Sequence, residues 1–178
     1  MTIDRNGTVN RKYLVLKINL KLKVDAPVKE IERKFLVDID IWGAQVKGAF
    51  SNISQAYLQN SKGQTIRLRL RDNKAYLTIK GPTKGLTRNE YEYEIPFKEA
   101  EQMIFDFKLK VLKKRRYLID FATKTWEVDV FEDQLKGLIL AEIELESEQE
   151  KFEKPDWVGE EVSYDESYFN ANLINRLS

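Results

Sequence analysis

Charged side chains recur at every second position in several segments of the sequence, often with one sign of charge. Arginines occupy alternate positions from Arg67 to Arg71, and glutamates do so from Glu142 to Glu146. Since side chains two residues apart in a strand share a face, each run gathers like charges on one face. Ligands of opposite sign relieve that repulsion: phosphate oxygens suit arginine and lysine, and divalent cations suit carboxylates. The pattern therefore indicates metal-assisted chemistry on a polyanion.

The same alternation also fits a simpler structure. An antiparallel sheet often exposes one face to water, and a solvated face alternates charged with apolar residues too. Periodicity alone favours this outward orientation, although a solvated face would usually interleave the two signs. It does not distinguish a charged face that points outward from one that lines the inside of a barrel.

The sequence contains neither histidine nor cysteine. This excludes thiol catalysis, cysteine-ligated metals and every catalytic site in which histidine activates a serine or cysteine. Any bound metal must be held by oxygen ligands, which favours Mg²⁺, Mn²⁺ or Ca²⁺. Phosphoryl transfer depends on positioning and charge neutralisation, so the absence of histidine does not argue against it.

The overall charge is balanced, with 30 lysines and arginines against 29 aspartates and glutamates. A general nucleic-acid-binding protein normally carries a clear basic excess, so we expect no nucleic-acid partner. No apolar run approaches the roughly 18 residues of a membrane span, and the charged N-terminus lacks the apolar core of a signal peptide. We therefore expect no membrane contact and a cytoplasmic location.

The charged segments are typical of strands with one apolar and one polar face. The expected strands are 13–24, 30–37, 54–59, 65–71, 75–80, 87–95, 111–119, 124–131 and 138–145, with 43–48 and Asn52 in connecting structure. Pro96 opens an expected helix, and the tail after residue 147 is expected to end in a helix. Neighbouring strands joined by short turns predict an antiparallel α+β fold, and about eight of them allow a closed barrel.

The charged segments also match a known family in their order along the chain. The matching segments are EIERKFL (30–36), IRLRLR (66–71), LTIKG (77–81), RNEYE (88–92), KRRY (114–117), EVD (127–129), EIE (142–144) and WVGEEV (157–162). One Glu-x-Glu-x-Lys segment would carry little weight, because charged alternation is common, but the ordered set is specific. Over about residues 29–178 the chain resembles the CYTH, or triphosphate tunnel metalloenzyme, family.

The resemblance implies an eight-stranded antiparallel β-barrel, the triphosphate tunnel, with a few flanking and closing helices and with its charged faces inward. This reverses the orientation that periodicity alone favours. The catalytic residues implied are Lys34, Arg71, Lys80 and Glu92. The substrate-binding residues implied are Lys34, Arg69, Arg71, Lys80, Arg88, Lys114 and Arg116. The implied ligands of Mg²⁺ or Mn²⁺ are Glu30, Glu32, Glu90, Glu92, Asp129, Glu142 and Glu144.

Three further expectations accompany the resemblance. Glu127 shares a face with Asp129 and is expected to support the acidic residues. Arg67 exceeds the two arginines that the resemblance requires, and we expect it at the tunnel mouth. The segment 157–162 is expected to form a turn before a closing helix.

The function implied is metal-dependent hydrolysis of a short triphosphate, with inorganic tripolyphosphate, cleaved to pyrophosphate and phosphate, as the leading substrate. The family also contains thiamine triphosphatases and class IV adenylate cyclases. A non-catalytic binder of polyphosphate or nucleotides is the alternative from another class, although such a binder gains nothing from carboxylates in its site. An ordinary solvated barrel used for protein contacts is a third hypothesis.

Residues 1–28 form an extension outside the resemblance, and residues 29–178 form the expected tunnel domain. The extension is basic and alternates from Leu14 to Val24, but it contains none of the matched motifs. Three alternatives stay open for it: an extra edge strand, an oligomer contact such as that of a homodimer, or sequence that is not native.

Overall fold

The computed structural model describes residues 28–44, 48–61 and 63–177, so the strand expected at 13–24 lies outside the described residues. One antiparallel sheet contains the strands β1 (Val28–Val37), β2 (Phe50–Ser61), β3 (Gln64–Arg71), β4 (Lys74–Lys80), β5 (Thr87–Ile95), β6 (Leu112–Phe121), β7 (Lys124–Phe131), β8 (Ile139–Glu144) and β9 (Val158–Glu161). The described helical segments are α1 (Ile39–Ala44), α2 (Phe97–Asp106), η1 (Asp133–Leu135), η2 (Glu166–Tyr168), α3 (Asn170–Leu173) and η3 (Ile174–Arg176).

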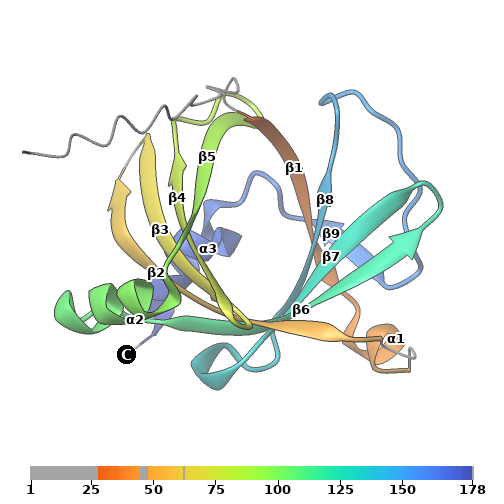
Figure 1. The fold of residues 1–178 in the computed structure, drawn as a ribbon. Coiled ribbons are helices and arrows are strands. Elements are labelled where there is room, and N and C mark those ends of the chain that lie inside the picture. The colour runs from red at the N-terminus through yellow and green to blue at the C-terminus, as the bar shows by residue number, and fades with distance from the viewer. Residues whose placement is uncertain (1–27, 45–47, 62, 178) are drawn as a thin grey trace, which may run out of the picture.

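The sheet closes on itself through β1 (Figure 1). Its strand order is β5-β4-β3-β2-β6-β7-β8-β1-β9, and an additional pairing joins β5 to β1. Residues at the start of β1 pair with β5, where Glu30 lies opposite Arg88, and the rest of β1 pairs with β8, where Glu32 lies opposite Glu144. The expected eight-stranded antiparallel barrel of an α+β fold is therefore confirmed, with β9 added beside the later part of β1.

Three expectations about secondary structure are wrong. Asn52 lies inside β2, because β2 begins at Phe50 and carries polar residues on both faces, which hides its alternation. The segment expected as a turn contains β9, whose Glu161 pairs with Phe35 of β1. The tail then forms short helical turns in place of one helix, because extended backbone at Phe169 (φ −69°, ψ 131°) interrupts them.

Within the described residues, no helix is long and apolar enough to cross a membrane.

An aromatic cluster covers the outer face of β1, β7 and β8. The fully buried ring of Trp126 lies 5.6 Å from Phe35, 5.8 Å from Phe152 and 5.9 Å from Trp157, measured between ring centroids. These edge-on contacts attach the segment before β9 to the barrel wall. The barrel is therefore packed from outside along these strands, which leaves the inner positions to polar side chains.

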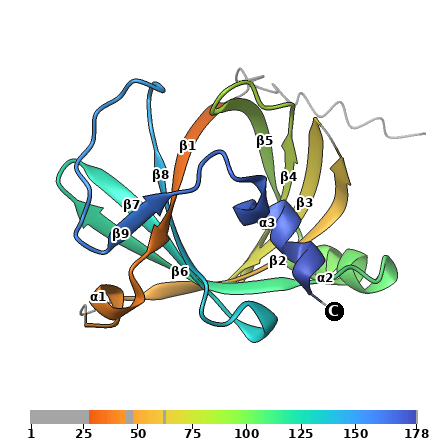
Figure 2. The same cartoon turned by 180° about the vertical axis from the view of Figure 1, so that it is seen from behind.

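A second core closes one end of the barrel interior. Leu112, Phe131 and Leu140 lie on the inner faces of β6, β7 and β8, and they pack against Leu173 and other apolar residues of the C-terminal segment. Figure 2 shows α3 and the chain around it crossing this side of the barrel. The C-terminal segment is thus part of the barrel core.

We expect Leu173→Ala to lower the free energy of unfolding by about 2–5 kcal/mol, because it leaves a cavity in this second core. Leu173 is fully buried, so the loss includes both transfer and cavity contributions. Urea denaturation followed by tryptophan fluorescence measures the change. Leu118→Ala is the matched control, because Leu118 is 52% exposed. Equal losses in the two variants would show that the C-terminal segment does not stabilise the barrel.

Candidate active site

The charged faces of the strands point into the barrel. Side chains less than a tenth exposed include Lys34, Arg67, Lys80, Lys114, Arg116, Asp129 and Glu142. At intervening positions, apolar residues such as Phe35, Val128 and Ile143 pack in the outer aromatic cluster. The inward orientation implied by the resemblance is confirmed for these residues, and the outward orientation favoured by periodicity is wrong. Charges are rarely buried unless they are paired, so the partners of these side chains become informative.

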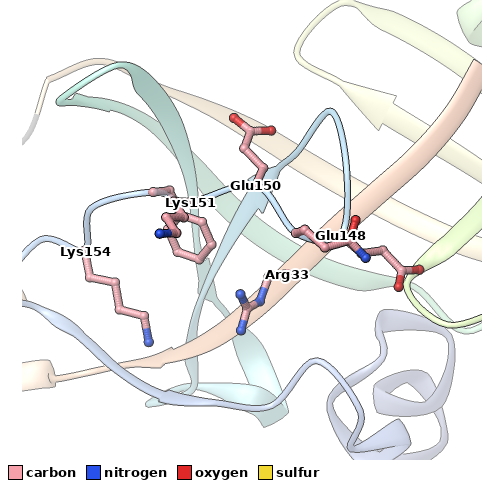
Figure 3. Close-up of a pocket in the computed structure, with 7 residues that line it drawn as sticks. Arg33, Glu148, Glu150, Lys151 and Lys154 are labelled. Carbon is pink, nitrogen blue, oxygen red and sulfur yellow. The ribbon is translucent and has the colours of Figure 1, made fainter.

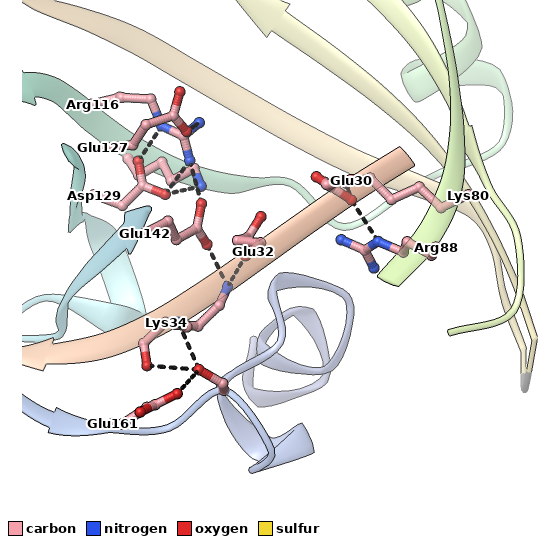
Figure 4. Close-up of polar contacts among 12 residues, drawn as sticks. Glu30, Glu32, Lys34, Lys80, Arg88, Arg116, Glu127, Asp129, Glu142 and Glu161 are labelled. Atoms are coloured by element: carbon pink, nitrogen blue, oxygen red, sulfur yellow. Dashed lines mark hydrogen bonds and ion pairs between the residues drawn. The ribbon is translucent and has the colours of Figure 1, made fainter. Parts of the chain in front are cut away.

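One group of ion pairs joins β1, β6, β7 and β8 (Figure 4). The Arg116 guanidinium donates to Asp129 Oδ1 at 2.7 Å and Oδ2 at 2.6 Å, and to Glu142 Oε2 at 2.9 Å. Lys34 donates to the other oxygen of Glu142, and Lys114 donates to Asp129. Burial alone would raise the pKa of Glu142, but Lys34 and Arg116 outweigh burial and hold it well below its usual value. Burial would also raise the pKa of Asp129, but Arg116 and Lys114 outweigh it and hold that pKa below its usual value.

A second group joins β1, β4 and β5. The Lys80 ammonium lies 2.8 Å from Glu30 Oε1 and 2.8 Å from Glu90 Oε2. Arg88 Nε donates to Glu30 Oε2 at 2.6 Å. The carboxylate of Glu30 thus bridges a lysine and an arginine, and each of these cations has an acidic partner within the barrel.

The arginines of β3 are less completely paired. Arg67 donates to Thr78 Oγ1 at 3.1 Å and lies 3.4 Å from Glu92, whereas Arg69 reaches Glu92 only at 3.9 Å. Burial, then repulsion from Arg67 and Arg116, lowers the pKa of the Arg69 guanidinium to about 10. Arg69 is therefore a buried cation whose charge is poorly compensated, and a bound anion would compensate it.

Arg67 differs from its expected position, whereas Arg71 lies on the expected inner face. Arg67 is 4% exposed and lies opposite Tyr57 and Thr78, so the expectation that it sits at the tunnel mouth is wrong. Arg67 is two residues before Arg69 in β3, so both side chains lie on the inner face of the strand. Arg71 lies near the β3–β4 turn, where its Nε is 3.4 Å from Ser51 Oγ. Arg71 therefore shares the inner face but joins neither group of ion pairs.

The acidic residues also divide into paired and unpaired members. Glu144 lies opposite Glu32, and within the described residues its carboxylate has no ion pair. Burial raises the pKa of Glu144, and so do the nearby carboxylates of Glu127, Glu30 and Glu32. Such crowding of carboxylates is relieved by a hard divalent cation, so Glu32 and Glu144 fit a Mg²⁺ or Mn²⁺ site.

Apart from Glu144, the proposed metal ligands already contact basic side chains of the protein, and Glu32 does so through Lys34 at 3.4 Å. Glu30, Glu90, Glu92, Asp129 and Glu142 each contact a lysine or arginine. Within residues 28–44, 48–61 and 63–177, no three carboxylates already surround a cation-sized space. Their participation in metal binding would therefore require a ligand that draws the basic side chains away.

Sequence reasoning missed two polar side chains on the inner face of β2. Gln55 is fully buried and its Nε2 donates to Tyr57 Oη at 3.1 Å. Burial raises the pKa of the Tyr57 hydroxyl, although Arg67 and Arg69 oppose that shift. Gln55 and Tyr57 are two residues apart, so period-two alternation along β2 was the signal that could have found them. The uncharged polar residues on the other face of β2 hide that alternation.

A separate shallow pocket lies on the outer surface of the barrel (Figure 3). It is lined by Arg33, Phe152, Lys154 and the segment 148–151. Arg33 alternates with the inward-pointing Glu32 and Lys34, so this pocket belongs to the opposite side of β1. Its charges are of mixed sign, and Arg33 is already paired with Glu161. The barrel interior is therefore the candidate active site.

Comparison with known proteins agrees with this geometry. The CYTH domain matches residues 28–178. An inorganic triphosphatase of Acetivibrio thermocellus is 44% identical over 147 residues, which cover 82% of this chain and 93% of the relative. An inorganic triphosphatase of Nitrosomonas europaea is 33% identical over 152 residues, covering 81% and 95%. The crystal structure of the inorganic triphosphatase NE1496 superposes with a TM-score of 0.58 at 31% identity, covering 84% and 97%. The inward-facing charges, the closed barrel and these matches together show that the chain belongs to the CYTH domain family.

Proposed function

We propose that the protein is an inorganic triphosphatase that hydrolyses tripolyphosphate to pyrophosphate and phosphate with the help of a divalent metal ion. The observation that carries this proposal is the charge of the barrel interior. Arg69 is buried there among other basic side chains with little compensation, and Glu144, opposite Glu32, has no ion pair in the part of the chain that the structure describes. The interior thus offers sites for a polyanion and for a cation together. Relatives that cover most of this chain bear the same activity in their names.

The basic side chains would bind the phosphate oxygens. Tripolyphosphate carries about four negative charges near neutral pH, so cations must surround it to offset the loss of hydration. The proposed contacts are Lys34, Arg69, Arg71, Lys80, Arg88, Lys114 and Arg116, with Arg67 now added because it lies inside the barrel. Those contacts also stabilise the charge that develops on the pyrophosphate leaving group.

The acidic side chains would supply the metal site and orient water. Glu144 and Glu32, which lie opposite each other, would begin this site, although Glu32 also lies 3.4 Å from the Lys34 ammonium. Glu30, Glu90, Glu92, Asp129 and Glu142 would contribute as substrate takes over their basic partners. Mg²⁺ or Mn²⁺, when bound, supplies charge neutralisation at the phosphoryl group. Glu92 accepts a hydrogen bond from Thr78 at 2.8 Å and adjoins Arg69, which places a carboxylate next to the proposed phosphate contacts.

An assay of the purified protein tests the proposed function. With Mg²⁺ or Mn²⁺ present, we expect faster phosphate release from tripolyphosphate than from ATP or thiamine triphosphate, and EDTA should abolish it. Cyclic AMP formation from ATP, with negligible phosphate release from tripolyphosphate, would identify a cyclase. Saturable tripolyphosphate binding without turnover, with every divalent ion tested, would identify a binding protein.

We expect Glu144→Gln to reduce activity about tenfold or more at limiting metal, because the amide keeps the shape but loses the charge that attracts a divalent cation. Raising the Mg²⁺ or Mn²⁺ concentration should restore part of kcat, which steady-state phosphate release measures. Glu142→Gln should resist such rescue, because it also leaves Lys34 and Arg116 short of a partner. Glu94→Gln, at an exposed ion pair with Lys74, is the matched control. No metal rescue of Glu144→Gln would indicate that its carboxylate orients water directly.

We expect a protein that begins at Val28 to fold and to hydrolyse tripolyphosphate with little change in kcat. Barrel closure depends on the pairing of Val28–Ile31 with β5, and none of the proposed site residues precedes Glu30. Solubility or self-association is the property that should change. Activity and size-exclusion chromatography of the full-length and shortened proteins make the comparison. A large loss of kcat in a folded, shortened protein would show that residues 1–27 help to build the site.

A further inference from the structure

The backbone of Lys34 is held by the chain that follows β9. Regular pairing of β9 with β1 reaches Phe35, which lies opposite Glu161. Beyond that point Val162 N donates to Lys34 O at 2.8 Å, while Lys34 N donates to Ser163 Oγ at 2.9 Å. A side-chain hydroxyl therefore accepts the hydrogen bond that a strand carbonyl would otherwise accept.

The Ser163 hydroxyl is itself fixed. It is 8% exposed, and it donates to Glu161 Oε1 at 2.7 Å while accepting from Lys34. Arg33 Nε donates to the same carboxylate at 2.7 Å, with a second contact from its other guanidinium nitrogen. The hydrogen bonds from Arg33 lower the pKa of Glu161, which keeps it charged as an acceptor. Arg33, Glu161 and Ser163 thus connect the outer surface of β1 to the backbone of Lys34. Figure 4 shows Glu161 beside the backbone of Lys34.

We propose that Ser163 is a positioning residue for the reaction, acting through Lys34; this inference rests on the proposed function. The Lys34 side chain is buried and lies between Glu142 and Glu32. A displacement of its backbone therefore changes where its ammonium meets both the ion pair and the substrate. Small misplacements of a reacting or binding group are costly, up to about 10²-fold for 1 Å. The C-terminal segment in this way contributes to catalysis without touching the substrate.

Substitutions at Ser163 that differ in the hydroxyl but not in side-chain shape test this inference. Ser163→Ala and Ser163→Val should each lower kcat for tripolyphosphate by about tenfold, with a smaller effect on KM. Ser163→Thr has the shape of the valine variant but keeps the hydroxyl, so it should retain most of the activity. Valine and threonine variants with equal kcat, or an alanine variant with unchanged kcat, would overturn the proposal.

A double-mutant cycle shows whether Ser163 acts through Lys34. In a Lys34→Ala background, Ser163→Ala should cost little further kcat, because the side chain that Ser163 positions is gone. A purely structural role predicts the same fold loss in both backgrounds, and that result would contradict the inference. If Ser163→Ala does not fold, Glu161→Gln provides a milder variant at a partly exposed position and should lower kcat in the same direction.

A second readout does not depend on activity. The ¹⁵N signal of the buried Lys34 ammonium, assigned by its loss in Lys34→Arg, should shift or broaden in Ser163→Ala and persist unchanged in Ser163→Thr. An unchanged signal in Ser163→Ala would overturn the inference even if the protein hydrolyses tripolyphosphate. Conversely, a wild-type protein without turnover would refute the proposed function, and the NMR comparison would still decide whether Ser163 positions Lys34.

Discussion

Replacing Lys34 with alanine is expected to lower kcat for tripolyphosphate by on the order of 10²-fold or more, with a much smaller effect on stability. Lys34 is 6% exposed, and its ammonium faces the barrel interior, where it pairs with Glu142 and lies 3.4 Å from Glu32. Loss of this cation removes charge stabilisation from a phosphoryl group. Stability should change less, because Arg116 still pairs with Glu142 at 2.9 Å.

The matched control for this variant is Lys74→Ala. Lys74 also pairs with a glutamate, Glu94, but more than half of each side chain is exposed. Exposed ion pairs contribute little to stability, and Lys74 contacts neither group of buried ion pairs. Steady-state phosphate release and thermal unfolding of both variants give the comparison. Near-normal kcat in Lys34→Ala would show that its proposed role is wrong.

The fold could be predicted where alternation is strong and pairing is local. The β3–β4 hairpin, β5 and β7 lie where the sequence places them, since each carries regular apolar and charged positions. β9 has no such pattern in its four residues and gains its structure from a distant edge of β1. Its hydrogen bonds to residues more than a hundred positions earlier have no local signature, so periodicity could not reveal it.

The site could be predicted only to the level of which residues share a face. Period-two alternation is the same whether a face points into the barrel or into water, so the orientation had to come from the resemblance and then from burial. Nor does alternation reveal which charges meet. Asp129 and Glu142 form ion pairs with Lys114, Arg116 and Lys34. These contacts depend on strand order and register around the closed barrel.

Substitution of two buried arginines should change the stability of the protein in opposite directions, while both substitutions lower activity. We expect Arg69→Met to lower kcat/KM for tripolyphosphate by on the order of 10²-fold, yet to raise the free energy of unfolding by on the order of 1 kcal/mol. The guanidinium of Arg69 is repelled by Arg67 and Arg116, and its nearest carboxylate oxygen is 3.9 Å away. Removing it relieves that repulsion and the cost of burying a poorly paired charge.

Arg116→Met provides the contrast, because it should lower both activity and stability. Arg116 contacts Asp129, Glu142 and Glu127, and burial of its guanidinium is outweighed by these carboxylates, which raise its pKa well above the usual value. Breaking such a buried network costs about 3–5 kcal/mol, since it leaves charges without partners. Urea denaturation of the two methionine variants, alongside phosphate release, measures both quantities. If Arg69→Met destabilised the protein as strongly as Arg116→Met, the charge of Arg69 would be compensated by groups of the protein. Arg69 would then no longer mark the place where a polyanion binds.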